Sequence, residues 1–103
     1  MTCSRNDVVL LPIPFTDLSS RKVRPAVVIG RRGSDLFLVP ISSQVANTDL
    51  LLQQWREAGL NVPCGVKAQI ATVEDTLVIK IVGQLRPADQ QSLNERLRAW
   101  LEL

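Results

Sequence analysis

Residues 24–41 read RPAVVIGRRGSDLFLVPI, which is two apolar runs joined by a polar segment with two glycines. Both runs are short and rich in β-branched side chains, a composition typical of buried strands. The segment between them, Gly30 to Asp35, holds residues that favour turns. We therefore predict a β-hairpin over residues 24–41, with its first strand beginning at Pro25.

The residues before this hairpin predict another strand and a loop. The stretch Asp7 to Phe15 is β-rich, and its prolines, Pro12 and Pro14, restrict it to a sheet edge or a strand end. Residues 16–23 are polar and rich in turn formers, so we expect a loop there. The chain thus enters the hairpin from a strand and an exposed loop.

The residues after the hairpin are less regular. Residues 49–59 carry apolar side chains that could form one face of a short helix or a strand that leads into a turn. Residues 66–73 and 77–82 have the β-branched composition of two further strands, joined at residues 74–76. Five or six strands are therefore expected in all.

The C-terminal residues change to a helical period. Pro87 is suited to a first helical turn, and Asp89 follows where the helix dipole favours an anion. Apolar residues then recur at helical spacing, at Leu93, Leu97, Trp100 and Leu101. Residues 1–103 are therefore expected to form a single domain of the α+β class, mostly β, with antiparallel strands in a small barrel or half-barrel and a C-terminal amphipathic helix.

The composition excludes several kinds of chemistry. The chain has 103 residues and no histidine, so imidazole cannot act as a base, an acid or a metal ligand. Its two cysteines, Cys3 and Cys64, are too few for a disulfide framework, and without histidine they do not predict a zinc site. No signal peptide or membrane span is evident, and we expect a cytoplasmic protein with free thiols and no cofactor.

The net charge of +2 is small, but the cations are unevenly placed. Six of the twelve Lys and Arg residues lie in residues 1–35, together with three of the ten acidic residues. Arginine presents a fork of donors that matches a phosphate, which suits nucleic-acid binding. An ordinary solvated surface would explain the same charges, and charge alone favours that interpretation.

Residues 6–29, NDVVLLPIPFTDLSSRKVRPAVVI, closely resemble the opening of the PemK/MazF-type toxins of bacterial toxin–antitoxin pairs. A second block, Pro40-Ile-Ser-Ser-Gln44, matches the end of the family's next strand. Three shorter matches follow, at residues 58–60, 71–73 and 82–85, before the closing helix. The resemblance covers nearly the whole chain. Asn6 replaces the family's usual glycine, which asparagine can do because it also tolerates unusual φ angles.

This resemblance implies an SH3-like β-barrel of five to seven strands with a terminal helix, and a homodimer. It makes a strand more favourable than a helix for residues 50–54. The implied activity is metal-independent, sequence-preferring cleavage of single-stranded RNA by a type II toxin that a small antitoxin protein restrains. By position, Arg24 matches the family's catalytic arginine, and Ser42 matches its catalytic threonine or serine.

This chemistry needs no histidine, because RNA supplies its own nucleophile, the 2′-hydroxyl. Arg24 could stabilise the charge on the phosphate, and Ser42 could donate to the same oxygens or to the leaving group. The candidates for the base that removes the 2′-hydroxyl proton are water and a carboxylate such as Asp17. In an antiparallel hairpin, the start of the first strand lies beside the end of the second, so Arg24 and Ser42 should converge.

The matching blocks also supply the residues expected to contact RNA. Arg21 and Lys22 could follow the backbone of a single strand, and Phe15 or a tryptophan could stack on a base. The full set of expected RNA-binding residues is Thr16, Asp17, Arg21, Lys22, Ser43 and Gln44.

Each of these residues also has a plainer interpretation. Arg24 could be a strand-end cation, Ser42 could cap a turn, and the two tryptophans could serve in packing or an interface. Two other functions remain open: a non-catalytic barrel that binds a protein, either the antitoxin or a gyrase-like target, and an RNA-binding module without chemistry.

Overall fold

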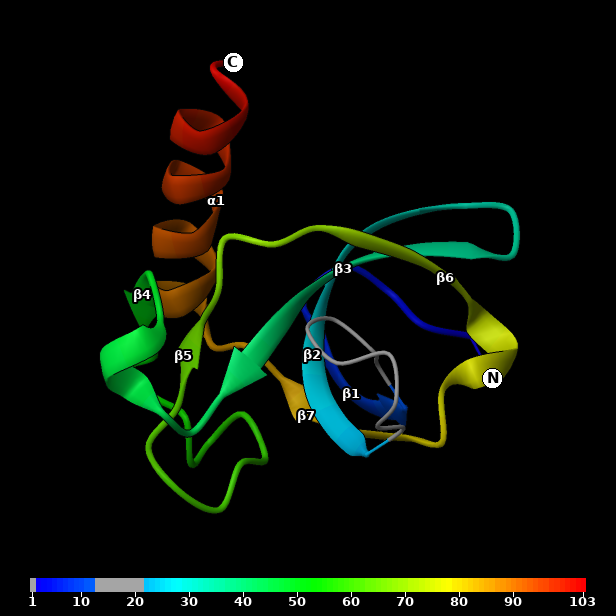
Figure 1. Cartoon of the computed structure of the whole chain (residues 1–103), viewed down its shortest axis with the longest axis horizontal. Helices are drawn as coiled ribbons and strands as arrows, with labels where there is room; N and C mark the ends of the chain where they lie inside the picture. The colour runs from blue at the N-terminus through cyan, green and yellow to red at the C-terminus, as the bar shows by residue number, and fades with distance from the viewer. Residues whose placement is uncertain (1, 13–21) are drawn as a thin grey trace.

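The computed structural model describes residues 2–12 and 22–103 as a strongly curved antiparallel sheet with a C-terminal helix (Figure 1). In chain order the elements are β1 (Asp7–Pro12), β2 (Val23–Arg32), β3 (Asp35–Ser42), η1 (Val45–Asn47), β4 (Leu50–Leu51), β5 (Gly65–Val66), β6 (Ala71–Glu74), η2 (Asp75–Leu77), β7 (Lys80–Gln84) and α1 (Pro87–Leu101). The strand order is β4-β5-β3-β2-β1-β7, and β6 also pairs with β3. Within the described residues β7 pairs with β1 alone, so the sheet is not closed by strand pairing. The predicted fold class, mostly β with a C-terminal helix, is confirmed.

The central hairpin forms from β2 and β3, as predicted, but its turn is shorter than expected. The strands remain paired as far as Arg32 and Asp35, and the chain reverses at Gly33 and Ser34. Gly30 does not belong to the turn, because the strand continues through it with a register shift that marks a β-bulge. The strand also begins at Val23, before the predicted Pro25, because its first residues already pair with β1.

Strand β1 lies between β2 and β7, so its proline marks a strand end and not a sheet edge. Residues 13–15 of the predicted strand lie outside the described part of the chain. Just before β1, Asn6 has a φ of 76°, so asparagine does adopt the left-handed conformation here. Its N–H donates to the Val28 carbonyl of β2 (2.7 Å), and its carbonyl accepts from the N–H of Leu85, the residue directly after β7 (2.9 Å).

The strands after the hairpin differ from the prediction. The single strand expected over residues 66–73 is two strands, because β5 pairs with one end of β3 and β6 with the other. The strand expected over residues 50–54 is limited to Leu50–Leu51, and residues 53–59 form turns. The strand expected from residue 77 begins at Lys80, because η2 occupies residues 75–77.

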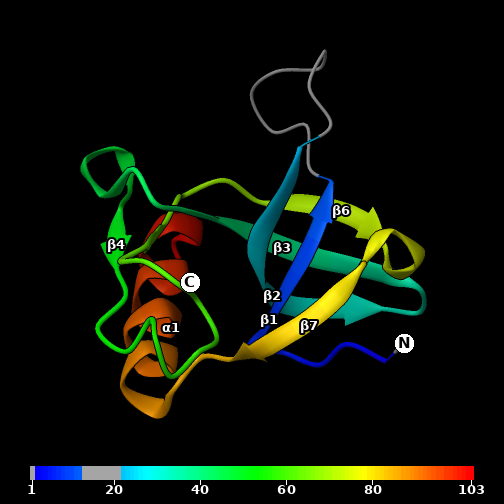
Figure 2. The same ribbon diagram turned by 90° about the horizontal axis from the view of Figure 1, so that it is seen from below.

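Buried side chains cover both faces of the sheet. Along the strands they alternate between two clusters, so that Val8 belongs to one and Val9 to the other. Helix α1 covers the first cluster through Leu93 and Leu97, beside β4 and β5 (Figures 1 and 2). The helix has Pro at its first turn, as predicted, and ends at Leu101, followed by Glu102 as its C-cap with a φ of 56°. Burial on both faces explains why these strands are continuously apolar.

Candidate functional site

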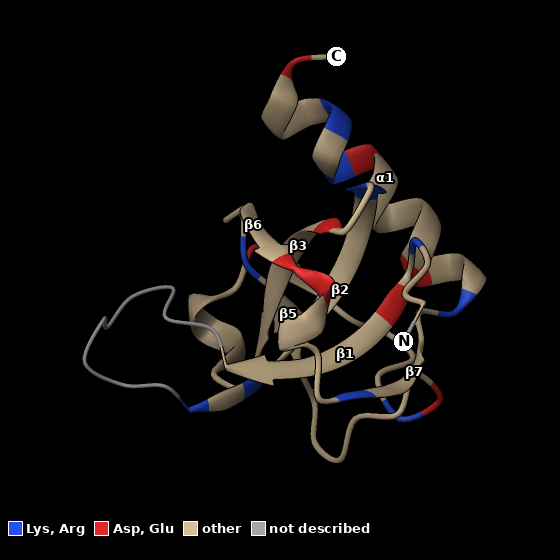
Figure 3. Cartoon of the chain, turned by 90° about the vertical axis from the view of Figure 1, so that its right-hand side faces the viewer, with Lys and Arg blue, Asp and Glu red and all other residues tan. Residues whose placement is uncertain are grey.

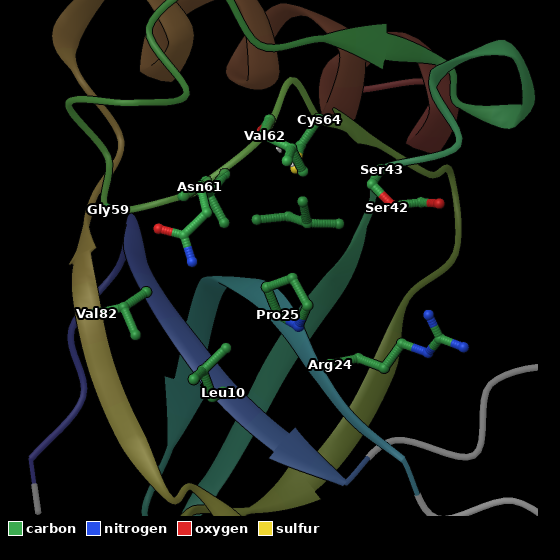
Figure 4. Close-up of a pocket in the computed structure, with 12 residues that line it drawn as sticks. Leu10, Arg24, Pro25, Ser42, Ser43, Gly59, Asn61, Val62, Cys64 and Val82 are labelled. Carbon is green, nitrogen blue, oxygen red and sulfur yellow. Dashed lines mark hydrogen bonds between the residues drawn. The ribbon is translucent and has the colours of Figure 1, made fainter.

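A pocket of about 280 Å³ opens where the hairpin faces the segment of residues 59–64 (Figure 4). Most of its lining is apolar, and three polar residues of the hairpin lie together on one side. The lining residues are Leu10, Arg24, Pro25, Ile41, Ser42, Ser43, Gly59, Leu60, Asn61, Val62, Cys64 and Val82.

The hairpin brings Arg24 and Ser42 to the same side of this pocket. Ala26 and Pro40 form the last pair of the hairpin ladder at this end, so Arg24 and Ser42 each lie two residues beyond it, at the open end of the hairpin. The strand that carries Arg24 is also held on its other side, since Arg24 pairs with Leu11 of β1. Arg24 and Ser42 are 18 residues apart in the sequence, and they reach the same pocket only because the hairpin forms.

The side chains of Arg24 and Ser42 differ in how exposed they are. Arg24 is exposed, whereas Ser42 is half-buried at the end of β3. The Ser42 Oγ accepts a hydrogen bond from the Gln44 backbone N–H (3.1 Å), so Ser42 does cap the turn after β3. This bond uses an acceptor site of the hydroxyl and leaves its proton free to be donated. Turn capping and phosphate binding by Ser42 are thus compatible.

The other predicted RNA-binding residues are not all brought together. Thr16, Asp17 and Arg21 lie outside the described residues. Ser43 lines the pocket beside Ser42, whereas Gln44 does not and accepts a hydrogen bond from the Asn47 amide (3.3 Å). Lys22 is exposed where the chain enters β2, and with Arg24 it forms the basic start of that strand (Figure 3).

The far wall of the pocket depends on a close contact between two backbones. A Cβ atom on Gly59 would clash with the carbonyl of Val82, and one on Gly83 would clash with the carbonyl of Ala58. Residues 58–60 and 82–85, two separate matches in the sequence, therefore form one crossing point. The sequence matches pointed to both segments, but they did not predict that the two segments are in contact.

Asp89 anchors the chain that leads to this wall. Its side chain is 1% exposed, and its two carboxylate oxygens accept hydrogen bonds from the backbone N–H groups of Gln53 and Gln54, both at 2.9 Å. In the sequence Asp89 was noted only as a helix N-terminal anion. Its second role had no local signal, because its partners lie 35 and 36 residues away.

Asn61 is the second residue that the sequence analysis missed. It lines the pocket on the side away from Arg24 and Ser42 (Figure 4). The block Ala58-Gly-Leu60 directly before it was the available signal, but that match carried no role for the next residue.

The remaining sequence candidates in the described residues lie in or against the core. Cys3 and Cys64 are buried free thiols, and burial raises the pKa of both. Trp55 and Trp100 pack against the first core cluster, and the Arg56 guanidinium lies 5.1 Å from the Trp55 ring centre. Within residues 2–12 and 22–103 no group of three cysteine or acidic residues is placed to hold a metal ion.

The sequence matches a family described as the PemK-like, MazF-like toxin of type II toxin–antitoxin systems, over residues 4–101. The chain belongs to this toxin family. No curated protein was found to match. In the described part of this PemK/MazF-like chain, no helix is long and apolar enough to cross a membrane.

Two solved structures show the same fold. An endoribonuclease in complex with its cognate antitoxin, from a mycobacterial species, superposes with a TM-score of 0.72 at 19% identity, covering 98% of this chain and 94% of that one. The Mycobacterium tuberculosis toxin MazF-mt6 superposes with a TM-score of 0.74 at 17% identity, covering 94% and 97%. At these identities the likeness establishes the fold of this PemK/MazF-like toxin.

Proposed function

We propose that this toxin is a metal-independent endoribonuclease that cleaves single-stranded RNA, such as mRNA, with a sequence preference. The observation that carries the proposal is the position of Arg24 and Ser42 on one side of the same pocket. At about 280 Å³ the pocket is slightly smaller than the range of about 300–1,000 Å³ usual for small-ligand pockets, so it would hold no more than part of one single-stranded segment.

The reaction follows from what these groups can donate. The 2′-oxygen of the RNA attacks the adjacent phosphorus, and the bond from phosphorus to the 5′-oxygen breaks. The products are a 2′,3′-cyclic phosphate and a 5′-hydroxyl. Arg24 stabilises the charge on the non-bridging oxygens, because its donor fork binds two of them at once. Ser42 donates its hydroxyl proton as a hydrogen bond to the same phosphate.

The two proton transfers have separate candidates. The 2′-hydroxyl proton leaves to water or to Asp17. The 5′-oxygen must gain a proton, and an arginine with a pKa above about 12 releases one poorly, so Arg24 acts mainly through its charge. Lys22, Ser43 and Gln44 would hold the flanking strand, together with Thr16, Asp17 and Arg21.

The partners follow from the family. One structural relative is in complex with its cognate antitoxin. We extend this to the present chain: a small antitoxin protein restrains it in the cytoplasm, and the active form is a homodimer. Sedimentation at micromolar concentration tests the dimer, which a monomer mass would contradict.

The central test is digestion of mixed-sequence RNA in EDTA, followed by mapping of the product ends. Arg24→Ala should lower the cleavage rate roughly 100- to 1,000-fold, the usual cost of removing a group that stabilises a transition state. Arg32→Ala is the matched control, since Arg32 is an exposed arginine at the opposite end of the same strand. Cleavage by the Arg24→Ala variant at the wild-type rate would contradict the proposal.

Ser42 is tested by a pair of variants. Ser42→Ala removes the hydroxyl and should lower the rate, whereas Ser42→Thr keeps it and adds a methyl group that restricts the rotamer. The threonine variant should therefore cleave at least as fast as the wild type. Equal rates for alanine, serine and threonine would show that Ser42 only caps the turn.

The second candidate function is a non-catalytic toxin that binds a protein. The observation in its favour is the hydrogen bond from Gln44 to the Ser42 Oγ, which gives this hydroxyl a structural role without catalysis. Intact RNA after prolonged digestion, together with recovery of gyrase or of the antitoxin alone in a pull-down, would favour it.

A further inference from the structure

The pocket has polar side chains on two sides, and the proposed cleavage uses only one of them. Arg24, Ser42 and Ser43 lie on the hairpin side, and the Asn61 carboxamide lies across from them (Figure 4). Between these sides the lining is mainly apolar. A bound nucleotide that places its phosphate near Arg24 would therefore direct another part of itself toward Asn61.

The Asn61 side chain is available to a ligand. Asn61 is exposed, and among the residues that the structure describes its carboxamide forms no hydrogen bond. It carries a carbonyl acceptor next to two amide donors. The carboxamide can hydrogen-bond both the donors and the acceptors on the edge of a nucleobase. A phosphate, which only accepts, would bind better to the cationic side of the pocket.

The backbone that presents Asn61 is held in place. Leu60, directly before it, is 8% exposed, and its N–H donates to the Trp55 carbonyl (3.1 Å). Gly59 lies against the Val82 carbonyl, and Asp89 binds the start of the same segment. A polar side chain on a fixed backbone can distinguish ligands, because it cannot move away to accommodate a base that does not match its donors and acceptor.

The neighbours of Asn61 suit the face of a base. Val62 and Val82 line the pocket beside it, and Val62 is 48% exposed. Apolar side chains can pack against the ring while an amide binds the ring's edge. The arrangement separates the two tasks, with phosphate binding on the hairpin and base contacts on the opposite wall.

We propose that Asn61 is a specificity-determining residue, which hydrogen-bonds the edge of one base next to the scissile phosphate. The inference rests on the proposed ribonuclease function, since it assumes RNA in this pocket. An asparagine contact of this kind discriminates between bases by about tenfold. Asn61 is expected to affect which sequences are bound, and Arg24 to affect how fast they are cleaved.

The experiment selects ligands from a random single-stranded RNA pool with 2′-fluoro sugars, which lack the attacking hydroxyl and cannot be cleaved. The wild type should enrich a particular base at one position, and Asn61→Ala should reduce that enrichment about tenfold. Asn61→Asp should shift the preference toward bases that present an amino group, because it replaces the donors with acceptors. Circular dichroism checks that each variant is folded.

Asn94→Ala is the matched control, because Asn94 is an exposed asparagine on α1 outside the pocket. It should keep the wild-type preference. An unchanged preference in Asn61→Ala, or a wild type without any preference, would overturn the inference.

A parallel digestion of ordinary RNA in EDTA separates the two proposals. If the wild type selects a base through Asn61 but cleaves no RNA, the ribonuclease proposal fails and base recognition stands. If it cleaves RNA with the same sequence preference with or without the Asn61 side chain, the ribonuclease proposal stands and the role of Asn61 is overturned.

Discussion

The β2–β3 hairpin and the segment of residues 49–64 face each other across the pocket, but they are built differently. The hairpin is a long paired ladder between other strands, with side chains such as Val28 and Leu38 fully buried. The opposite segment has one strand of two residues, β4, and its long-range contacts include the two hydrogen bonds to Asp89 and the close approach of Gly83. The proposed catalytic pair therefore lies on the rigid side, and the proposed base contact depends on a few long-range contacts.

The largest effect is expected from a cavity in the hairpin side. Leu38→Ala removes a fully buried side chain and should lower the free energy of unfolding by about 2–5 kcal/mol, measured by urea denaturation. Leu103→Ala, at a position that is 77% exposed, is the control and should change it little. A small loss for Leu38→Ala would mean that the hairpin is not the more stable of the two regions.

The next effect is expected at the glycine crossing. Gly83→Ala would force a methyl group into the Ala58 carbonyl, so we expect a loss of about 1–3 kcal/mol in the free energy of unfolding. Faster hydrogen exchange in residues 54–60 than in β2 should accompany it. Gly30→Ala is the control, since its Cβ would meet only the Phe37 ring at an ordinary 3.4 Å. Equal losses for both variants would contradict the crossing as the critical contact.

A smaller effect is expected from Asp89→Asn. The change keeps the side chain's shape but turns one acceptor into a donor that faces a backbone N–H, which should cost about 1–2 kcal/mol of stability. Because Asp89 acts on the wall that carries Asn61, base preference should weaken more than the cleavage rate. The exposed Asp35→Asn is the matched control. A variant that loses rate but keeps its preference would contradict the division between the two sides.

The smallest effect is expected at the hairpin turn. Gly33 has a φ of 60° with no neighbouring atom near its Cβ position, so Gly33→Ala is strained by its backbone alone and should lose roughly 1 kcal/mol. Gly33→Asn should lose less, because asparagine tolerates this conformation. Thermal denaturation compares the two. Equal losses would indicate that the turn is limited by something other than backbone conformation.

Local patterns predicted the elements whose side chains follow one period. Pro87 and the apolar spacing that ends at Leu101 gave the helix, and the two apolar runs of residues 24–41 gave the hairpin. Gly30 misled the prediction, because a glycine in a bulge and a glycine in a turn look alike in a sequence. The strand expected over residues 66–73 failed for a different reason: β5 and β6 pair with different ends of β3, and pairing partners are not visible locally.

The candidate site divides in the same way. Arg24 and Ser42 could be named in advance, because the family resemblance matched both positions and an antiparallel hairpin brings its two open ends together. Asn61 and Asp89 could not be given roles, because each acts across a contact with a segment remote in sequence. The blocks around Gly59 and Gly83 were visible, but their meeting point was not.

The sequence by itself therefore determined the fold class, the hairpin, the helix and the absence of histidine chemistry, since all of these depend on composition and short-range periodicity. Tertiary structure alone decided where residues 49–64 lie and hence what faces Arg24 across the pocket. The physical reason is that this segment has little regular hydrogen bonding of its own. Its position comes from long-range contacts: the buried Asp89 carboxylate, the glycine crossing, the pairing of β4 with β5 and the burial of its apolar side chains in the first core cluster. These contacts exist only once the helix, β5 and β7 are assembled.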